Sequence, residues 1–383
     1  MLQTYFLMKL LKIIFLSIFL VIFSCKKENN TIKSNYIKSS IKYAKGFDIQ
    51  YFDNYKKIVI KSPYPDAKEQ FEYILIANEN SSKFKSEAVP VIHTPVEKIV
   101  VTSTTHIPML ELLDEENSLI GFPNLQYISS EKTVKNIQQG NIRELGKGEH
   151  INTEVLIDIT PEVVVSFSMT SDNKMFSTIE KAGIPVLLNG DWLEETPLGR
   201  AEWIKFFGAL YNKEKEADSI FASIEKEYSQ AVEIAKNAEK KPTVLSGVMF
   251  KDSWNLPAGE SFVAQFLKDA NTNYLWSNTK GKGSLSLNFE TVYEKGQHAE
   301  FWIAPGHYKS LKELNEANDH YTQFEAFKTN NIYSFANTTG TTGGVLYYEL
   351  APVQPQIVLK DIIKITHPEL LPNYQPFFLK KLQ

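Results

Sequence analysis

Short apolar runs alternate with helical patterns along most of the chain. Nearly continuous apolar runs, typical of buried strands, occur at 98–102, 119–122, 163–167, 184–188, 244–249, 299–304 and 332–335. Between them lie segments with helical features, at 107–113, 153–159, 178–182, 261–268 and 352–365. Strands that alternate with helices predict βαβ units and mostly parallel sheets, so the fold class is α/β.

One helical pattern is much longer than the others. Between residues 212 and 240, apolar side chains recur at three- and four-residue intervals, at Ala217, Ile220, Phe221, Ile224, Tyr228, Ala231 and Ala235. This spacing predicts an amphipathic helix of roughly 40 Å. It divides the alternating pattern in two, which predicts two Rossmann-like three-layer lobes, 47–211 and 241–383, joined by the helix 212–240.

The N-terminal lobe begins with a segment of a different kind. Two β-rich runs, 58–60 and 73–76, are separated by a turn-forming stretch that contains Pro63 and Pro65. We therefore expect a small extra β segment at 47–90. Residues 26–30 are all polar, and we expect residues 25–46 to be a tether.

The single cysteine, Cys25, lies at the end of a secretion pattern. Lys9 and Lys12 precede an apolar run at 13–23 that is too short to span a bilayer permanently. The run ends in Ser24-Cys25, which resembles a bacterial lipobox. We expect residues 1–24 to be a lipoprotein signal peptide, with either Met1 or Met8 as the start. Acylated Cys25 would hold an exported, periplasmic protein to a membrane, and the leaflet stays open.

Composition excludes several other classes. A net charge of −4 gives no electrostatic footprint for nucleic acid, and one cysteine can form neither an internal disulfide nor a cysteine-based metal site. The sequence lacks G-x-S-x-G, a P-loop, G-x-G-x-x-G and H-E-x-x-H. Its seven histidines are scattered, and none is paired at helical spacing. We therefore expect no catalytic residue, no resident metal and no cofactor.

Aromatic residues gather in the loops that we expect after the strands. They are Tyr127, Trp192, Trp254, Tyr274, Trp276, Tyr347 and Tyr348. In open α/β sheets, ligands bind in the crevice outside the carboxyl ends of the strands. Aromatic side chains there predict a large, partly apolar ligand.

Several segments, in order and spacing, resemble one family. They are 98–103, 152–165, 182–186, 269–274 and 287–290. Together with the lipobox and the long helix, they resemble the periplasmic substrate-binding proteins of ABC importers for iron–siderophore, haem and cobalamin complexes. The resemblance covers about residues 97–383, and leaves the role of the leading β segment open.

The resemblance implies a binding protein and not an enzyme. A metal chelate would sit between the lobes, near the aromatic loops and near helix starts at Ser103, Thr104 and Ser284. Glu154 and Glu290 fall where the family places one acidic residue on each lobe to pair with arginines of the permease dimer. We expect a monomer that delivers its ligand to a permease and its ATPase.

The identity of the chelate stays open. Arginine occurs only at Arg143 and Arg200, which disfavours anionic catecholate siderophores and leaves a neutral siderophore, haem or a corrinoid. A cobalamin receptor of the same family is one alternative. A two-lobe α/β hydrolase and a surface lipoprotein that binds another protein are alternatives from other classes.

Overall fold

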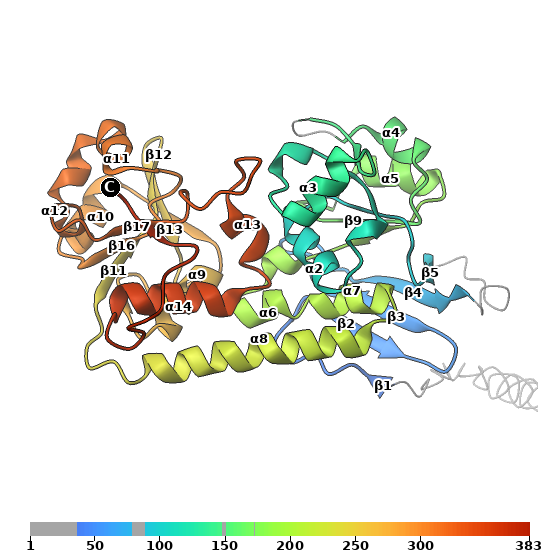
Figure 1. Ribbon diagram of the computed structural model, residues 1–383, viewed down its shortest axis with the longest axis horizontal. Helices are drawn as coiled ribbons and strands as arrows, with labels where there is room; N and C mark the ends of the chain where they lie inside the picture. The colour runs from blue at the N-terminus through green and yellow to red at the C-terminus, as the bar shows by residue number, and fades with distance from the viewer. Residues whose placement is uncertain (1–36, 79–88, 148–150, 172) are drawn as a thin grey trace, which may run out of the picture. The chain divides into compact units, whose positions relative to one another are not determined.

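The computed structural model describes residues 37–78, 89–147, 151–171 and 173–383. The predicted signal peptide, Cys25 and most of the predicted tether lie outside the described residues. The rest forms an α/β fold with two lobes and a leading sheet (Figure 1).

The N-terminal lobe is built on a fully parallel sheet in the order β10-β9-β6-β7-β8. Its strands are β6 (Ile99–Val101), β7 (Leu119–Phe122), β8 (Arg143–Glu144), β9 (Val163–Ser166) and β10 (Val186–Leu188). Both faces of β6 and β9 are buried, which explains their continuous apolar runs. The helices of this lobe include α2 (Ile107–Leu112), α3 (Glu131–Gln138), α4 (Thr153–Asp158) and α5 (Lys174–Lys181).

These helices cover the two faces of the sheet and make three layers. On one face, Leu156 of α4 and Ile179 of α5 pack with Val100 and Val164. On the other face, α2 and the following helices α6 (Pro197–Ala201) and α7 (Ile204–Leu210) join the main core. The predicted Rossmann-like three-layer lobe is therefore confirmed.

The leading segment forms a sheet of its own, in the order β1-β2-β3-β4-β5. Its strands are β1 (Ile37–Lys38), β2 (Phe47–Tyr51), β3 (Lys56–Ile60), β4 (Phe71–Ala77) and β5 (Val91–Thr94). All pairs are antiparallel except β4 with β5. The sheet packs on the N-terminal lobe, where the ring of Phe47 lies 4.5 Å from that of Trp203.

The predicted tether extends too far along the chain. Backbone N–H groups of residues 42–44 donate to the buried carboxylate of Glu202, and those of residues 45–46 donate to Glu194. Residues 42–46 are thus held against the N-terminal lobe, because two buried carboxylates need donors and these N–H groups supply them.

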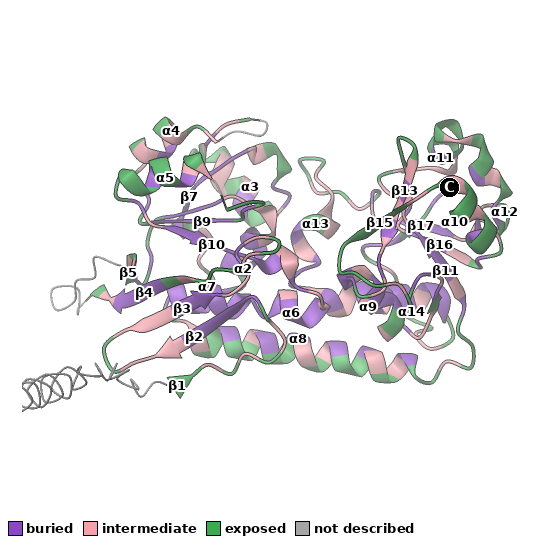
Figure 2. Cartoon of the chain, turned by 180° about the vertical axis from the view of Figure 1, so that it is seen from behind, coloured by how far each residue is buried: buried purple, intermediate pink, exposed green. Residues whose placement is uncertain are grey.

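The long helix α8 spans Glu214–Ala235, shorter at both ends than the predicted 212–240. Its buried residues are Ala217, Phe221, Ile224, Tyr228, Ala231 and Ala235, the stripe that the sequence pattern indicates. Figure 2 shows buried and exposed positions alternating along it. The helix packs on α7 of the N-terminal lobe and on α14 (Pro355–Thr366) of the C-terminal lobe, so it contacts both lobes.

The C-terminal lobe contains two sheets. The larger has the order β14-β11-β16-β17-β18, with β11 (Thr243–Ser246), β14 (Asn273–Tyr274), β16 (Phe301–Ile303), β17 (Ile332–Ser334) and β18 (Lys380–Lys381). It is parallel except at β18. Its helices include α9 (Phe262–Asp269), α10 (Phe289–Gly296), α11 (Leu311–Ala317), α12 (Glu325–Lys328) and α13 (Leu346–Leu350).

The smaller sheet corrects one predicted strand. It is antiparallel and consists of β12 (Val248–Phe250), β13 (Ser253–Pro257) and β15 (Ser284–Leu287). The apolar run 244–249 was predicted as one strand, but Gly247 has φ +76° and divides it between the two sheets. A side chain at Gly247 would collide with the backbone of β13, so glycine is required there.

Candidate ligand-binding site

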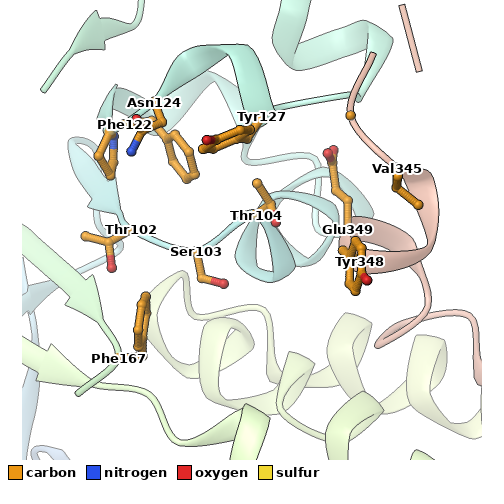
Figure 3. Close-up of a pocket in the computed structure, with 12 residues that line it drawn as sticks. Thr102, Ser103, Thr104, Phe122, Asn124, Tyr127, Phe167, Val345, Tyr348 and Glu349 are labelled. Atoms are coloured by element: carbon orange, nitrogen blue, oxygen red, sulfur yellow. The ribbon is translucent and has the colours of Figure 1, made fainter. Parts of the chain in front are cut away.

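A pocket of about 330 Å³ opens at the carboxyl ends of β6, β7 and β9 (Figure 3). Its lining is Thr102, Ser103, Thr104, Phe122, Pro123, Asn124, Tyr127, Phe167, Gly344, Val345, Tyr348 and Glu349. The first eight come from the N-terminal lobe, because the carboxyl ends of parallel strands meet at one edge of the sheet. The last four come from a segment that follows β17 of the C-terminal lobe, so both halves of the chain build the pocket.

The loop after β6 is fixed by hydrogen bonds that its hydroxyl groups make with one another's backbone and with neighbouring loops and strands. The Thr102 and Ser166 hydroxyls lie 2.8 Å apart, and Ser103 accepts from the N–H of Thr105 at 3.3 Å. Thr105 in turn donates to the carboxylate of Asp191 at 3.0 Å. The short helix η2 (Thr104–His106) therefore starts at Ser103, and the pocket gains a floor of small polar groups.

Residues 338–349 form the opposite wall and lie directly on the N-terminal lobe. The Thr342 hydroxyl donates to the carbonyl of Ile128 at 2.8 Å. Gly340 and Gly344 lie so close to Ser129 that a side chain at either position would collide with it. The glycines of this segment thus permit a backbone approach that other residues would prevent.

Glu349 completes that contact. Its carboxylate accepts hydrogen bonds from the backbone N–H groups of Ser129 at 2.7 Å and Ser130 at 2.9 Å. The residue is only 1% exposed. Burial raises the pKa of Glu349 to about 7; the two N–H donors oppose this shift, and the nearby Glu111 carboxylate adds to it.

The pocket carries no positive charge. Its lining residues include no lysine, arginine or histidine, and Glu349 is their one carboxylate. Among the described residues, no group of three or more His, Cys, Asp and Glu side chains could hold a metal ion.

Exposed aromatic rings surround the pocket. Tyr127 is 59% exposed and Tyr348 is 55% exposed, and Phe167 is also exposed. Large side chains that stay exposed together, and do so around a pocket, are typical of a surface that an apolar partner covers. The arrangement suits a ligand with apolar faces and a polar rim.

Four of the predicted ligand-binding residues line this pocket: Ser103, Thr104, Tyr127 and Tyr348. Tyr347 is not among the lining residues; its ring stacks on that of Phe335, with the ring centres 4.5 Å apart, and meets the ring of Tyr348 edge-on. Trp192 lines a different cavity, described below. Whether any of these residues contacts a ligand stays a prediction.

Three predicted residues lie elsewhere. Trp254 is fully buried, stacks on Trp302 and donates from Nε1 to the carbonyl of Ser246, so it belongs to the core. Trp276 is 4% exposed and is also a core residue. Ser284 begins strand β15 and does not begin a helix, so it offers no helix N-terminus.

The predicted ligand-binding residues did not include Glu349, Asn124, Phe167 and Gly344, which line the pocket. Asn124 comes two residues after the predicted strand 119–122, and Phe167 ends the predicted strand 163–167, so their position at strand ends was a usable signal. Glu349 had no such signal, because its partners Ser129 and Ser130 are far away in the sequence.

Glu154 and Glu290 occupy the same place on two helices. Each lies in an exposed first turn, of α4 and of α10. Asn152 caps α4 by accepting from the N–H of Val155 at 3.1 Å, and Asn288 caps α10 by accepting from that of Thr291 at 2.8 Å. A first-turn carboxylate is favourable to the helix dipole by itself, so the docking role stays a prediction.

Comparison with known proteins places this geometry in context. A family model described as "Periplasmic binding protein" matches residues 99–338. An uncharacterized lipoprotein of Methanocaldococcus jannaschii is 28% identical over 378 residues, which cover 92% of this chain and 88% of the relative.

Two solved structures show the same fold at low sequence identity. One is a possible iron-binding, periplasmic solute-binding protein of Staphylococcus epidermidis, with a TM-score of 0.57 and 14% identity, covering 72% of this chain and 100% of the other. The second is the periplasmic haem-binding protein of Vibrio cholerae, with a TM-score of 0.54 and 14% identity, covering 69% and 99%.

Proposed function

The chain belongs to the periplasmic binding protein family, and we propose that it captures a metal chelate between its lobes and delivers it to the permease of an ABC importer. The family is one of substrate-binding proteins, so the chemistry is binding and not catalysis. The observation that carries the proposal is the pocket at the carboxyl ends of β6, β7 and β9, because residues from both halves of the chain line it.

The lining favours a neutral chelate. Anionic catecholate complexes need cationic groups, preferably arginine forks, and none lines the pocket. Hydroxyl groups at Thr102, Ser103 and Thr104 can bond to neutral oxygens of a chelate, while Tyr127 and Tyr348 can cover its apolar faces. A ferric trihydroxamate and a corrinoid both have this chemistry, so a cobalamin receptor is the alternative within the family.

We also propose that Cys25 is acylated and holds the protein to a membrane. The M. jannaschii relative is named a lipoprotein, which supports this reading of the lone cysteine. In the part of the chain that the structure describes, no helix combines the length and the apolar character needed to cross a bilayer. Metabolic labelling with an alkyne fatty acid should mark the wild type and not Cys25→Ser.

The chelate proposal is tested by titrating the purified protein with a ferric trihydroxamate, haem, cyanocobalamin and a ferric tricatecholate. We expect tryptophan fluorescence quenching and a raised Tm with a neutral chelate, and much weaker binding of the tricatecholate. Failure of all four to bind would refute the proposal. Preference for cyanocobalamin would select the corrinoid alternative.

A further inference from the structure

A second cavity, of about 600 Å³, lies beside the loop that follows β10, which is an edge strand of the N-terminal sheet. Its walls come from the leading segment at 45–46 and 62–67, the loop 190–195 after β10, Arg200 of α6, and residues 282–283 before β15. The family match begins at residue 99. The wall that the leading segment supplies is therefore an addition to the part of the chain that the family describes.

Arg200 enters this cavity without a carboxylate partner. It donates from Nη2 to the carbonyl of Trp192 at 2.9 Å and makes a longer contact from Nε to that of Glu194 at 3.5 Å. Its guanidinium carbon lies 3.8 Å from the centre of the Phe262 ring. Among the described residues, no carboxylate forms an ion pair with it. A guanidinium has five N–H donors in a fork that fits a carboxylate, so most of its capacity is unused.

The neighbouring carboxylates are already occupied. Glu194 accepts from the N–H groups of Lys45 and Gly46 and from Nε1 of Trp203. Asp191 accepts from Thr105. Burial lowers the pKa of Arg200, which Asp191 and Glu194 only partly oppose. The guanidinium is thus partly buried, and no described carboxylate is in contact with it.

The other charged side chains that line the cavity also leave Arg200 without a described carboxylate in contact. Glu195 is shared by two cations, Lys45 at 3.2 Å and Lys282. Asp66 is exposed, at a turn where φ is +59°. The rim therefore carries two carboxylates and two ammonium groups. Glu195 is paired with both ammonium groups, and Asp66 is exposed to water.

Trp192 supplies a second donor with nothing to bind. Its Nε1 atom is buried, and no described residue accepts a hydrogen bond from it. A buried donor without a partner is costly, and native structures keep few of them. Trp192 and Arg200 line the same cavity and are already joined through the Trp192 carbonyl.

We propose that this cavity binds a carboxylate group, with the Arg200 guanidinium and the Trp192 indole N–H as its donors. The carboxylate belongs either to a free small carboxylic acid or to an arm of the chelate held in the first pocket. The proposal goes beyond the proposed function, because the cavity could take a free carboxylate even if no chelate bound.

The test uses the full-length chain in detergent and two matched pairs of probes. The first pair is malonate and its uncharged diamide. The second is a ferric trihydroxamate with a terminal carboxylate and the same chelate with a terminal amide. Calorimetry should show at least tenfold tighter binding of the carboxylate in one pair. Malonate binding identifies a free carboxylate, and preference only within the chelate pair identifies an arm.

Variants show whether Arg200 and Trp192 are the residues that bind the carboxylate. Arg200→Gln should abolish the preference, Arg200→Lys should reduce it at least fivefold, and Trp192→Phe should weaken it about threefold because only the N–H is lost. Arg143→Gln, which removes the exposed arginine on β8, should leave it unchanged. Equal binding of carboxylate and amide in both pairs would overturn the proposal. So would a preference that survives in both Arg200 variants, each checked for an unchanged Tm. If neither chelate binds but malonate does, the carboxylate site stands and the chelate function fails.

Discussion

The carboxylate of Glu349 accepts a hydrogen bond from the backbone N–H of Ser129 at 2.7 Å, although 220 positions separate the two residues. The same carboxylate accepts a second hydrogen bond from the N–H of Ser130, which is the residue that caps the N-terminus of α3. One side chain of the C-terminal half thus fixes the start of a helix in the N-terminal lobe. It does so from the wall of the proposed chelate pocket, and its carboxyl group is buried.

This contact predicts a pH dependence of stability. Burial raises the pKa of Glu349 to about 7, so the folded protein holds a proton that the unfolded chain releases near pH 4.5. The folded state then binds more protons, and the free energy of unfolding should fall as pH rises from about 5 to 8. The Glu349 contribution to that fall is about 3 kcal/mol at most.

Urea unfolding at pH 5, 6, 7 and 8 measures this dependence. Glu349→Gln cannot ionise, so its curve against pH should be flatter than that of the wild type by about that amount. Glu216→Gln makes the same change at an exposed position in the first turn of α8 and should keep the wild-type slope. Parallel curves for the wild type and Glu349→Gln would show that this carboxyl does not titrate in that range.

The leading segment depends on another buried carboxylate. Glu202 is fully buried, and it accepts from the backbone N–H groups of Lys42, Tyr43 and Ala44 and from the ammonium of Lys205. Glu202→Gln should lower the free energy of unfolding by roughly 2–4 kcal/mol, because the amide leaves some of the three N–H groups without their acceptor and Lys205 without its buried counter-charge, although Lys205 keeps the Ser40 carbonyl and Asp218 as partners. Hydrogen exchange at residues 42–44 should accelerate at the same time.

Glu225 provides the control for this prediction. It pairs with the side chains of Lys42 and Tyr43 at the surface of α8. Glu225→Gln should cost less than about 1 kcal/mol, the usual range for an exposed pair. A loss as large as that of Glu202→Gln would mean that the side-chain contacts, and not the backbone donors, hold the segment.

The sequence predicts most elements because their patterns are local. The buried stripe of α8 and the apolar runs of β6 and β9 depend on spacing within one segment, so they can be identified without knowledge of neighbours. The break at Gly247 could not be predicted in this way. Its backbone angle is imposed by β13, a strand that the pattern did not indicate.

The candidate site was harder to predict because burial is a property of the whole fold. Trp254 and Tyr348 both follow predicted strands, yet one is fully buried and the other 55% exposed. Hydrophobicity alone does not separate them, since both rings can serve a core or a binding surface. Glu349 depends on a contact across the two halves of the chain, and no local pattern reveals such a pair.

These two aromatic residues should therefore respond differently to truncation. Trp254→Ala removes a core ring that stacks on Trp302, and it should destabilise the protein by about 3–5 kcal/mol. Tyr348→Ala should change Tm by only a few degrees and weaken neutral-chelate binding about tenfold. Thermal melting and fluorescence titration measure the two effects, and Trp254→Phe serves if the alanine variant does not fold. A Tyr348→Ala protein that binds the chelate as well as the wild type would remove Tyr348 from the site.

The proposed permease contact makes the last prediction, which concerns Glu154 and Glu290. Both carboxylates are exposed in the first turn of an Asn-capped helix, one on each lobe, and neither lines the pocket. Charge reversal at both, Glu154→Lys with Glu290→Lys, should abolish chelate uptake by cells and leave the Kd of the purified protein unchanged. Glu216→Lys reverses a charge at an exposed first turn of α8 and should leave uptake near the wild-type level, which separates docking from a general effect of the helix dipole. Normal uptake by the double variant would show that these carboxylates do not orient the protein on its permease, and a weakened Kd would show that they act through the fold.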